Sequence, residues 1–472
     1  MKVFSRFKIK PVVATAMTLA ALGGAAFAAT AVDWSKPEPG EELSAGDTTV
    51  FETNRRAFSL PVANMSLDRR GDFAVGHSFF NMPWVEAPAS TKARDGLGPH
   101  FIGRSCTACH THDGRGQPPG PGEQPMGLLL RLSVPGKTAN GAPMHEPTYG
   151  GQFNNNAVSG VKPEGKVEIT YDEVPGQFAD GEAFSLRKPT YKFYDLGYGP
   201  MDERVMVSPR IAQQVIGMGL LEAIPEKDIL SRADPDDKNG DGISGRPNWV
   251  WNAVEKKRAL GRFGWKANSP TVAHQTAEAA NSDIGITSHI FPREECMPAQ
   301  KDCQQAERGG DPEINEKNLG KLIFYTATTA VPARRDVDKP QVLQGKRLFH
   351  EAQCVACHVP KHVTGKLAGY PELSNQTIRP YTDLLLHDMG PGLADGRPDF
   401  EASGNEWRTP PLWGIGLFET VNGHTTYLHD GRARNLQEAI LWHGGEAEPA
   451  KQHFVNMSKE EREALIAFLK SL

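Results

Sequence analysis

Two short runs of the same form constrain this chain more than any other feature: Cys-Thr-Ala-Cys-His at residues 106–110 and Cys-Val-Ala-Cys-His at residues 354–358. Two cysteines one helical turn apart can bond covalently to the two vinyl groups of a haem, while the adjacent histidine ligates the iron. A thioredoxin-like redox pair needs no histidine, and a zinc site needs further ligands nearby. The sequence therefore predicts two c-type haems. The predicted haem-binding residues are Cys106, Cys109, His110, Cys354, Cys357 and His358.

The first 28 residues have the layout of a cleaved secretory signal. Four basic residues precede an alanine-rich apolar run that ends in Ala26-Phe27-Ala28. The alternative is a membrane anchor, although the run is short and is interrupted by Gly23 and Gly24. We therefore expect export to the periplasm. In that oxidising compartment the two cysteines outside the haem motifs, Cys296 and Cys303, are expected to form a structural disulfide.

The net charge of the chain indicates which kinds of partner it can bind. The formal net charge is −5, and removal of the four basic residues with the signal would make the chain more acidic. An acidic exported protein gives no indication of nucleic-acid binding, so none is expected. The same charge favours a basic redox partner.

Patterns around the second motif predict a small cytochrome domain at residues 336–472. Pro340 begins a helical stretch that carries Gly345 on its apolar face, and Ser458–Glu461 is a capping box that begins a last helix. A first helix with a small residue that crosses a last helix with an aromatic residue is how a cytochrome c encloses its haem. Residues 29–335 are then expected to form a larger N-terminal haem domain.

The region before this domain is too large for a bare cytochrome. The two motifs begin 248 residues apart, at 106 and 354, and their flanks are dissimilar, so no tandem repeat is evident. Apolar and polar residues alternate over Val167–Tyr171, which predicts one strand of a small β hairpin with residues 185–193. Ser208 and Pro209 are expected to begin a helix that runs to Glu222. The predicted fold class is mainly α, with two cytochrome c-like haem domains, the N-terminal one enlarged by insertions that include the hairpin.

A further motif is suited to a metal ion. Asp237, Asn239 and Asp241 alternate in Asp-Lys-Asn-Gly-Asp-Gly, which fits the first half of a calcium-binding loop. The twelfth position is Asn248, where such loops carry a bidentate glutamate. Calcium at these three residues is one interpretation, and a solvated acidic turn is the other.

Several segments together give the chain a family resemblance. The segments are Cys106–Gly116, Asp241–Asn248, Leu386–Leu393, Arg408–Ile415, Tyr427–Arg434 and His443–Ala447. In this order they resemble the bacterial di-haem cytochrome c peroxidase superfamily, and most closely its di-haem oxidoreductase family, whose members are also labelled thiol oxidoreductases. The resemblance implies two mostly helical, cytochrome c-like domains whose haems face each other across an interface. It also implies that the C-terminal haem relays electrons and that the N-terminal haem meets hydrogen peroxide.

The resemblance places the distal ligand of the C-terminal haem at His443, at the end of the helix after the Tyr-Leu-His-Asp-Gly motif. Relatives often have methionine at this point, so histidine predicts a lower reduction potential. The alternatives are that His443 only caps a helix and that Met389 is the ligand. His429, inside the motif itself, is interpreted as a residue that forms hydrogen bonds near the haems rather than as a ligand.

The sequence does not single out one distal ligand for the iron of the N-terminal haem. His112, Met126, Met144 and His145 follow the first motif and are candidate ligands, although Met126 fits a buried position at a strand entry better. If none of them ligates, the iron is open, as cleavage of a peroxide bond requires. A carboxylate must then move a proton, and Glu222 is the candidate catalytic residue because it ends an apolar helix.

These features predict an exported di-haem c-type oxidoreductase, with peroxidase-like chemistry. The alternatives are an electron-transfer cytochrome without catalysis and a dehydrogenase that oxidises a small sulfur or other donor. The expected partners are a small redox protein, either a cytochrome c or a cupredoxin, and hydrogen peroxide or another small substrate. Members of the superfamily often form dimers, so a homodimer is also expected.

Overall fold

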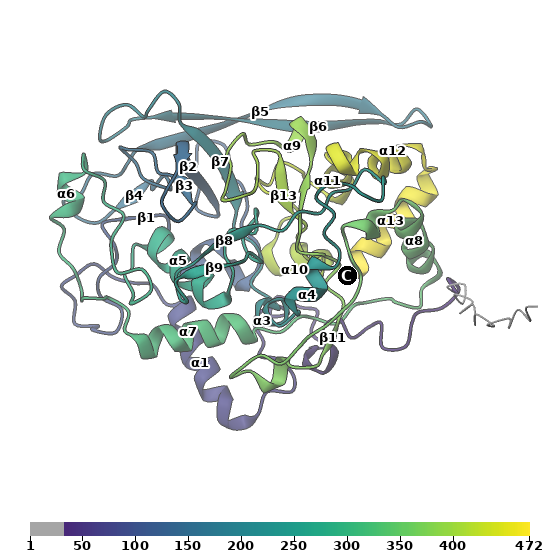
Figure 1. The fold of residues 1–472 in the computed structure, drawn as a ribbon, viewed down its shortest axis with the longest axis horizontal. Coiled ribbons are helices and arrows are strands. Elements are labelled where there is room, and N and C mark those ends of the chain that lie inside the picture. Colours follow the sequence, from purple (N-terminus) through teal and green to yellow (C-terminus); the bar gives the residue numbers. More distant parts are fainter. Residues whose placement is uncertain (1–32) are drawn as a thin grey trace, which may run out of the picture. The chain divides into compact units, whose positions relative to one another are not determined.

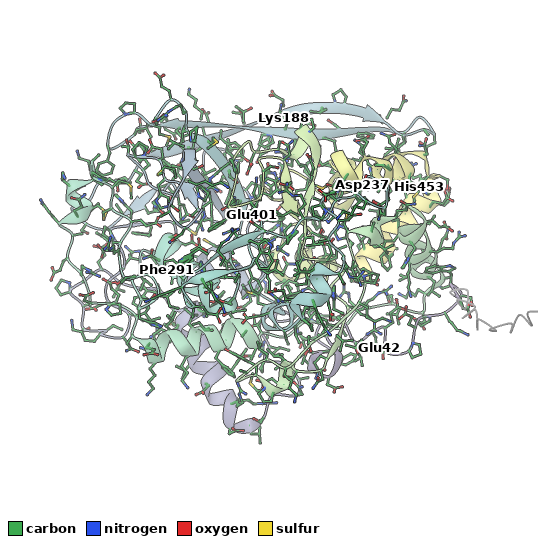
Figure 2. The ribbon with its side chains drawn as sticks, in the orientation of Figure 1. Glu42, Lys188, Asp237, Phe291, Glu401 and His453 are labelled. Atoms are coloured by element: carbon green, nitrogen blue, oxygen red, sulfur yellow. A yellow bond between two sulfur atoms is a disulfide. The ribbon has the colours of Figure 1, made fainter. Side chains whose placement is uncertain are left out.

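The computed structural model describes residues 33–472, so the predicted signal at residues 1–28 lies outside the described residues. Residues Trp34–Leu472 form one compact unit, and the boundary between residues 335 and 336 stays a prediction. In this unit no helix is long and apolar enough to cross a membrane. Figure 2 shows side chains throughout the space between the ribbons, with Lys188 on the outer edge.

The predicted mainly α fold is wrong, because helices hold only 29% of the chain and strands hold 18% in many small sheets. Most of the longer strands lie between the two haem motifs (Figure 1). Strand β2, Leu128–Lys137, shows why they were missed. Its buried residues Leu128, Leu130 and Leu132 alternate as a strand requires. However, leucine also favours helices, so its residue types did not indicate a strand.

The second motif is enclosed by a crossing pair of helices, as predicted. Helix α8, Pro340–Glu351, packs against the last helix α13, Lys459–Ser471, which begins at the predicted capping box. Gly345 lets the helices approach, because a Cβ added there would lie 2.7 Å from the Cβ of Phe468. Four residues after Gly345, Phe349 lies 5.1 Å from the Phe468 ring and 6.2 Å from the His358 ring.

A second pair of helices repeats this arrangement at the first motif. Helix α1, Leu67–Asn81, packs against α7, Glu316–Thr328. A Cβ added at Gly76 would lie 2.6 Å from the Cβ of Tyr325. Phe80, four residues on, lies 5.3 Å from the Tyr325 ring and 6.1 Å from the His110 ring. The chain therefore contains a structural repeat that its dissimilar flanking sequences do not reveal.

The helix predicted from Ser208 to Glu222 is wrong over its first half. Strand β7, Met206–Ile211, pairs antiparallel with β2, so that Leu128 faces Ile211 and Leu130 faces Pro209. Pro209 is tolerated because β7 is an edge strand of the sheet β3-β2-β7. Only the short helix α3, Met218–Glu222, follows.

The predicted β hairpin is confirmed and is longer than expected. Strands β5, Lys166–Gln177, and β6, Ala183–Tyr194, pair along their whole length. Figure 1 shows the hairpin running from the β2 and β7 region to the C-terminal helices. Its tip contacts them, since Phe178 lies 6.0 Å from Phe454 and Arg462 bonds Asp180 at 2.8 Å. The hairpin therefore ties the two motif regions together.

Short elements and one disulfide complete the fold. Cys296 and Cys303 form the predicted disulfide. The remaining helices are α2 Cys106–Cys109, α4 Glu226–Leu230, α5 Val272–Ile284, α6 Lys301–Gln304, α9 Gly390–Leu393, α10 Phe418–Asn422, α11 Leu436–Leu441 and α12 Glu448–Asn456. The remaining strands are β1 His100–Phe101, β3 Pro143–Met144, β4 Asn156–Ala157, β8 Trp249–Asn252, β9 Lys257–Leu260, β10 His362–Val363, β11 Thr377–Ile378, β12 Leu386–Asp388 and β13 Glu406–Arg408.

Candidate haem-binding sites

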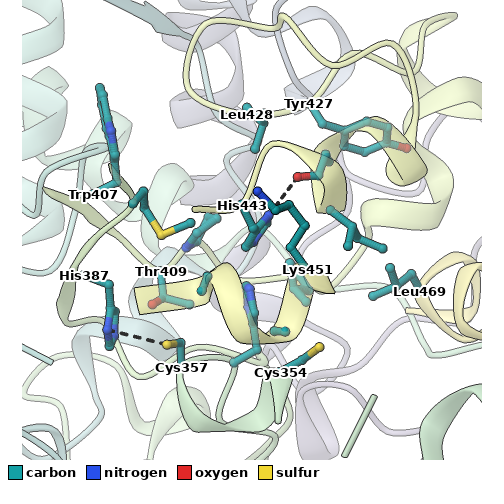
Figure 3. Close-up of a pocket in the computed structure, with 18 of the residues that line it drawn as sticks. Cys354, Cys357, His387, Trp407, Thr409, Tyr427, Leu428, His443, Lys451 and Leu469 are labelled. Atoms are coloured by element: carbon teal, nitrogen blue, oxygen red, sulfur yellow. Dashed lines mark hydrogen bonds between the residues drawn. The ribbon is translucent and has the colours of Figure 1, made fainter. Parts of the chain in front are cut away.

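A cavity lies beside the second motif and is mostly apolar (Figure 3). Cys354, Cys357 and His358 line it, and so does His443 from the turn after α11. The thiols are free, and burial raises the pKa of Cys354 to about 12 and that of Cys357 in the same direction. The structure therefore brings three residues of the motif and the predicted distal ligand to one space.

The two histidines have the same hydrogen-bond pattern. Nδ1 of His358 donates to the carbonyl of Tyr381 at 3.0 Å, and Nδ1 of His443 donates to the carbonyl of Ala439 at 2.7 Å. A carbonyl only accepts, so Nδ1 carries the proton in both rings and the lone pair is on Nε2. Burial, and then the nearby His443, lower the pKa of His358 to about 4. Both rings are therefore neutral and ready to bind a metal through Nε2.

Two buried arginines also line this cavity without a carboxylate partner among the described residues. Arg115 donates to the carbonyl oxygens of Thr426 and Leu428, and Arg408 donates to those of Gly264 and Thr409. Burial lowers the pKa of each guanidinium to about 10. Asp430 and Asp383 offset this burial in part, but neither forms a direct ion pair with these arginines, so the cavity suits an anionic ligand. The carboxylates of a haem meet that requirement.

His387 forms a charged network at the base of the cavity. Its Nδ1 lies 2.7 Å from a Glu446 oxygen and 3.5 Å from the Cys357 sulfur, and its Nε2 lies 2.8 Å from an Asp383 oxygen. Figure 3 marks the Cys357 contact with a dashed line. Burial alone would lower the pKa of His387, but the two carboxylates raise it well above its usual value. His387 is therefore an imidazolium held between two carboxylates.

An aromatic cluster forms another wall of the cavity. The Trp407 ring stacks on His429 at 3.8 Å and 12°, and Trp265 lies edge-on to His429 at 6.5 Å. Nδ1 of His429 donates to the carbonyl of Pro209, and Nε2 has no partner among the described residues. His429 and His443 therefore line the same cavity from two different segments of the chain.

The cluster also connects to the first motif. The Trp265 indole donates to the carbonyl of Ile211 at 2.8 Å, and the Ile211 amide donates to the carbonyl of His429. The next residue, Ala212, packs against Cys109. Ile211, the last residue of β7, thus contacts the aromatic cluster, and the next residue contacts Cys109 of the first motif.

The first motif begins with helix α2 and continues into a strained turn. His112 and Asp113 have φ values of 54° and 61°. Asp113 is buried and accepts a hydrogen bond from the Tyr325 hydroxyl at 2.6 Å, which fixes the turn to α7. Nδ1 of His110 has no partner among the described residues. Burial lowers the pKa of His110, so this ring is also neutral.

Charged residues lie near the first motif. Burial, and then the charge of Asp283, raise the pKa of Cys106 to about 12. Burial also raises the pKa of Asp283, and the charge of Arg131 acts on that carboxyl in the opposite direction. Asp283 and Arg131 therefore lie close to the predicted attachment point of the first haem.

The sequence comparison agrees with this geometry. A model of the family described as "Di-haem oxidoreductase, putative peroxidase" matches residues 40–472. The chain belongs to this family. No curated protein and no solved structure matched the chain. The di-haem oxidoreductase assignment accounts for the two motifs, since the match covers both of them.

The four candidate distal ligands of the first site do not occupy buried positions in this di-haem oxidoreductase. The side chains of Met126 and Met144 are 48% and 40% exposed, and His145 is exposed. The expected buried position of Met126 is therefore wrong, and only its carbonyl contacts Cys109, at 2.9 Å. His112 is in the turn directly after His110. No described contact joins their side chains to the ring of His110, and a role as iron ligand for any of them stays a prediction.

Glu222 lies at the end of α3, as its sequence position requires, and burial raises its pKa. Its carboxylate accepts a hydrogen bond from the amide of Val272 at 2.6 Å, in the first turn of α5. No described contact joins it to Cys106, Cys109 or His110. A catalytic role for Glu222 stays a prediction, while its visible role is to cap α5.

The candidate calcium loop is exposed at the surface, and Figure 2 labels Asp237 there. Asp237 and Asp241 accept hydrogen bonds from amides inside the loop, and Asn239 bonds Asp241 at 3.0 Å. Asn248, at the twelfth position, is buried and holds the carbonyl oxygens of Lys266 and Asp399. Within residues 33–472 no group of three or more histidine, cysteine or acidic side chains is placed to hold a metal ion. The calcium site stays a prediction.

Sequence reasoning missed several residues of both sites. His387 lies in Leu386–Leu393, which gave the resemblance but was assigned no role. Trp407 directly precedes the quoted segment Arg408–Ile415. Asp283 carried no signal, because it is near the first motif only after folding. Long-range contacts of this kind have no local sequence pattern.

Proposed function

We propose that this di-haem oxidoreductase is exported, binds two haems covalently and acts as a peroxidase in the periplasm. Cys106, Cys109 and His110 would hold one haem, and Cys354, Cys357 and His358 the other. Haem c supplies one-electron chemistry and, where the iron has a free position, binding and reduction of peroxide. The family assignment and the geometry of the six residues support this proposal.

The two sites differ in the residues that can reach the distal side of each iron, and we assign them different roles on that basis. His443 faces the cavity of His358 with a free Nε2, which suits an iron that is closed on both sides and only relays electrons. None of the four candidate residues is buried beside His110. The first site therefore suits an open iron, and the reaction with peroxide is assigned to it.

The aromatic cluster supports electron relay between the sites. Trp407 and His429 line the C-terminal cavity, and Trp265 connects through Ile211 to the residue that packs on Cys109. Stacked aromatic rings in a buried region provide a short path through bonds and contacts. Electrons would enter from a small basic cytochrome c or cupredoxin at the C-terminal site.

Proton movement at the first site needs a carboxylate, and Asp283 is the described carboxylate best placed for it. Burial raises its pKa to about 6, although Arg131 acts against this. Gln152 fixes the carboxylate with a hydrogen bond of 3.0 Å. A carboxyl group with a pKa near the working pH can both accept and return a proton.

Steady-state oxidation of a reduced cytochrome c by hydrogen peroxide tests the proposal. The experiment compares the oxidised holoprotein with the protein after addition of one electron per molecule. Peroxide-dependent turnover in either state, lost in His110→Gly, is expected. Absence of turnover in both states would refute the peroxidase. Reduction of both haems by thiosulfate, with no peroxide turnover, would support oxidation of a sulfur donor instead.

A further inference from the structure

His387, Asp383 and Glu446 connect the attachment loop of the C-terminal haem to the turn that carries His443. The three side chains are nearly buried, with exposed fractions of 3%, 2% and 12%. They come from three separate segments: β12, the loop before it, and the 3₁₀ turn Gly445–Ala447. The His387–Asp383 pair is local, whereas the His387–Glu446 pair joins two segments that are far apart in the sequence.

Glu446 is the most heavily bonded member of this network. Its carboxylate accepts from His387 at 2.7 Å, from the Ser244 hydroxyl at 2.6 Å and amide at 3.1 Å, and from the Asp388 amide at 3.2 Å. Four donors on one carboxylate fix both of its oxygens. Since Glu446 is three residues after His443, these bonds also restrict where the His443 backbone can lie.

The backbone around Glu446 is packed just as closely. Gly445 has a φ of 55°, and a Cβ added there would lie 2.6 Å from the amide nitrogen of Gly390. A Cβ added at Gly444 would lie 3.0 Å from the carbonyl oxygen of Met389. The turn after His443 therefore rests directly on the segment 388–390, and no larger residue fits between them.

We propose that His387 and Glu446 act as a positioning clamp that holds His443 at bonding distance from the iron of the C-terminal haem. The inference rests on the proposed role of His443 as the distal ligand. Nδ1 of His387 lies near both the Cys357 sulfur and the Glu446 carboxylate, while Nε2 bonds Asp383 and fixes the ring, so the clamp joins the attachment motif to the distal turn. Among the described residues, the side chain of His443 forms one hydrogen bond, to the carbonyl of Ala439 in the preceding helix α11. The clamp, and not that bond, sets the position of the turn against the haem.

The test uses the holoprotein and compares Glu446→Gln and His387→Gln with wild type and with His443→Ala. Glu460→Gln is the matched control, because Glu460 is exposed in the first turn of α13, far from the network in sequence. The readouts are the low-spin ferric signal of the C-terminal haem in electron paramagnetic resonance and the rate of cyanide binding to that haem. Both clamp variants are expected to convert part of the low-spin signal to high-spin and to bind cyanide at least ~10-fold faster, equivalent to about 1.4 kcal/mol.

Unchanged low-spin signal and cyanide rate in both clamp variants, with a normal wild-type signal, would overturn the clamp. Ser244→Ala removes a single donor and serves if the other variants fold poorly; a smaller change in the same direction is expected, and no change would count against the clamp. Wild-type protein without a bis-histidine low-spin signal would instead refute the proposed role of His443. The signal of the N-terminal haem should not move, which separates the clamp from a general loss of structure.

Discussion

The two haem-binding regions share a helix frame and differ on the far side of the iron. In each, a glycine lets two helices cross and a phenylalanine four residues later faces the motif histidine: Gly76 with Phe80, and Gly345 with Phe349. His443 lines the same cavity as His358, whereas the charged residues Arg131 and Asp283 lie near the first motif. In the proposed function the shared frame would hold each haem, and the residues beyond the iron would decide its chemistry.

The regions also differ in what lies between their framing helices. Between α8 and α13 there are short helices and two-stranded sheets, whereas the segment between α1 and α7 holds β2, β7 and the long hairpin. That segment supplies contacts to both sites. The hairpin reaches α12 and α13, and β7 separates the aromatic cluster from Cys109.

The largest expected effect comes from removing either attachment pair. Cys106→Ser with Cys109→Ser, and Cys354→Ser with Cys357→Ser, should each retain one covalent haem per chain instead of two. Only the first pair should abolish the reaction with peroxide, because the proposed function assigns the open iron to that site. Mass spectrometry and the pyridine haemochrome assay measure the haem content. Equal loss of the peroxide reaction in both variants would break the comparison.

Because the two helix pairs cross in the same way, replacing either glycine by alanine should destabilise the protein to the same extent. Gly76→Ala and Gly345→Ala should each lower the free energy of unfolding by about 3 kcal/mol, because the added methyl group meets the backbone of the facing helix. Gly320→Ala is the control. Gly320 has open space in the same helix α7, so alanine should stabilise by about 0.5 kcal/mol. Urea denaturation measures the free energy of unfolding of all three variants. An unchanged value for Gly76→Ala or Gly345→Ala would contradict close helix packing at that crossing.

Asp283, near the first motif, predicts that the free energy of unfolding depends on pH. The pKa of Asp283 is raised to about 6, so between pH 4 and 6 its carboxyl is ionised in the unfolded chain but protonated in the folded one. The free energy of unfolding should therefore fall with rising pH across this window, by about 2 kcal/mol more in wild type than in Asp283→Asn. Urea titrations at several pH values test this, with the exposed Asp236→Asn as control. Parallel pH profiles for wild type and Asp283→Asn would contradict the raised pKa.

The smallest effect is expected at the aromatic link. Trp407→Phe keeps a ring beside His429 but removes the indole, so electron transfer between the haems should slow by ~10-fold, equivalent to about 1.4 kcal/mol. Stopped-flow oxidation of the half-reduced protein by peroxide measures this rate. Trp249→Phe, which is outside the cavity, should leave the rate unchanged. An electron-transfer rate equal to that of wild type in both variants would contradict a role for Trp407 in the electron path.

Local patterns predicted the capping box, the hairpin and the disulfide, because each depends on residues close together in the sequence. The two helices of the C-terminal frame are far apart in the sequence, and their crossing was expected because a cytochrome c domain encloses its haem in this way. The N-terminal frame escaped because Gly76 and Tyr325 are separated by the inserted strands. The fold class was wrong because β2 is built from leucines and β7 contains Pro209, so neither has typical strand residues. His387 was visible in a motif, but its role depends on Glu446 and Asp383, which meet it only in the folded chain.

Low-temperature electron paramagnetic resonance of the oxidised holoprotein tests the difference between the two far sides most directly. One low-spin signal, lost in His443→Ala, together with one high-spin signal, lost when Cys106 and Cys109 are replaced, is the predicted result. Two low-spin signals in the oxidised protein, with the remaining ferric signal still low-spin after one electron is added per molecule, would contradict the account. Both irons would then be closed, and the protein would be an electron carrier.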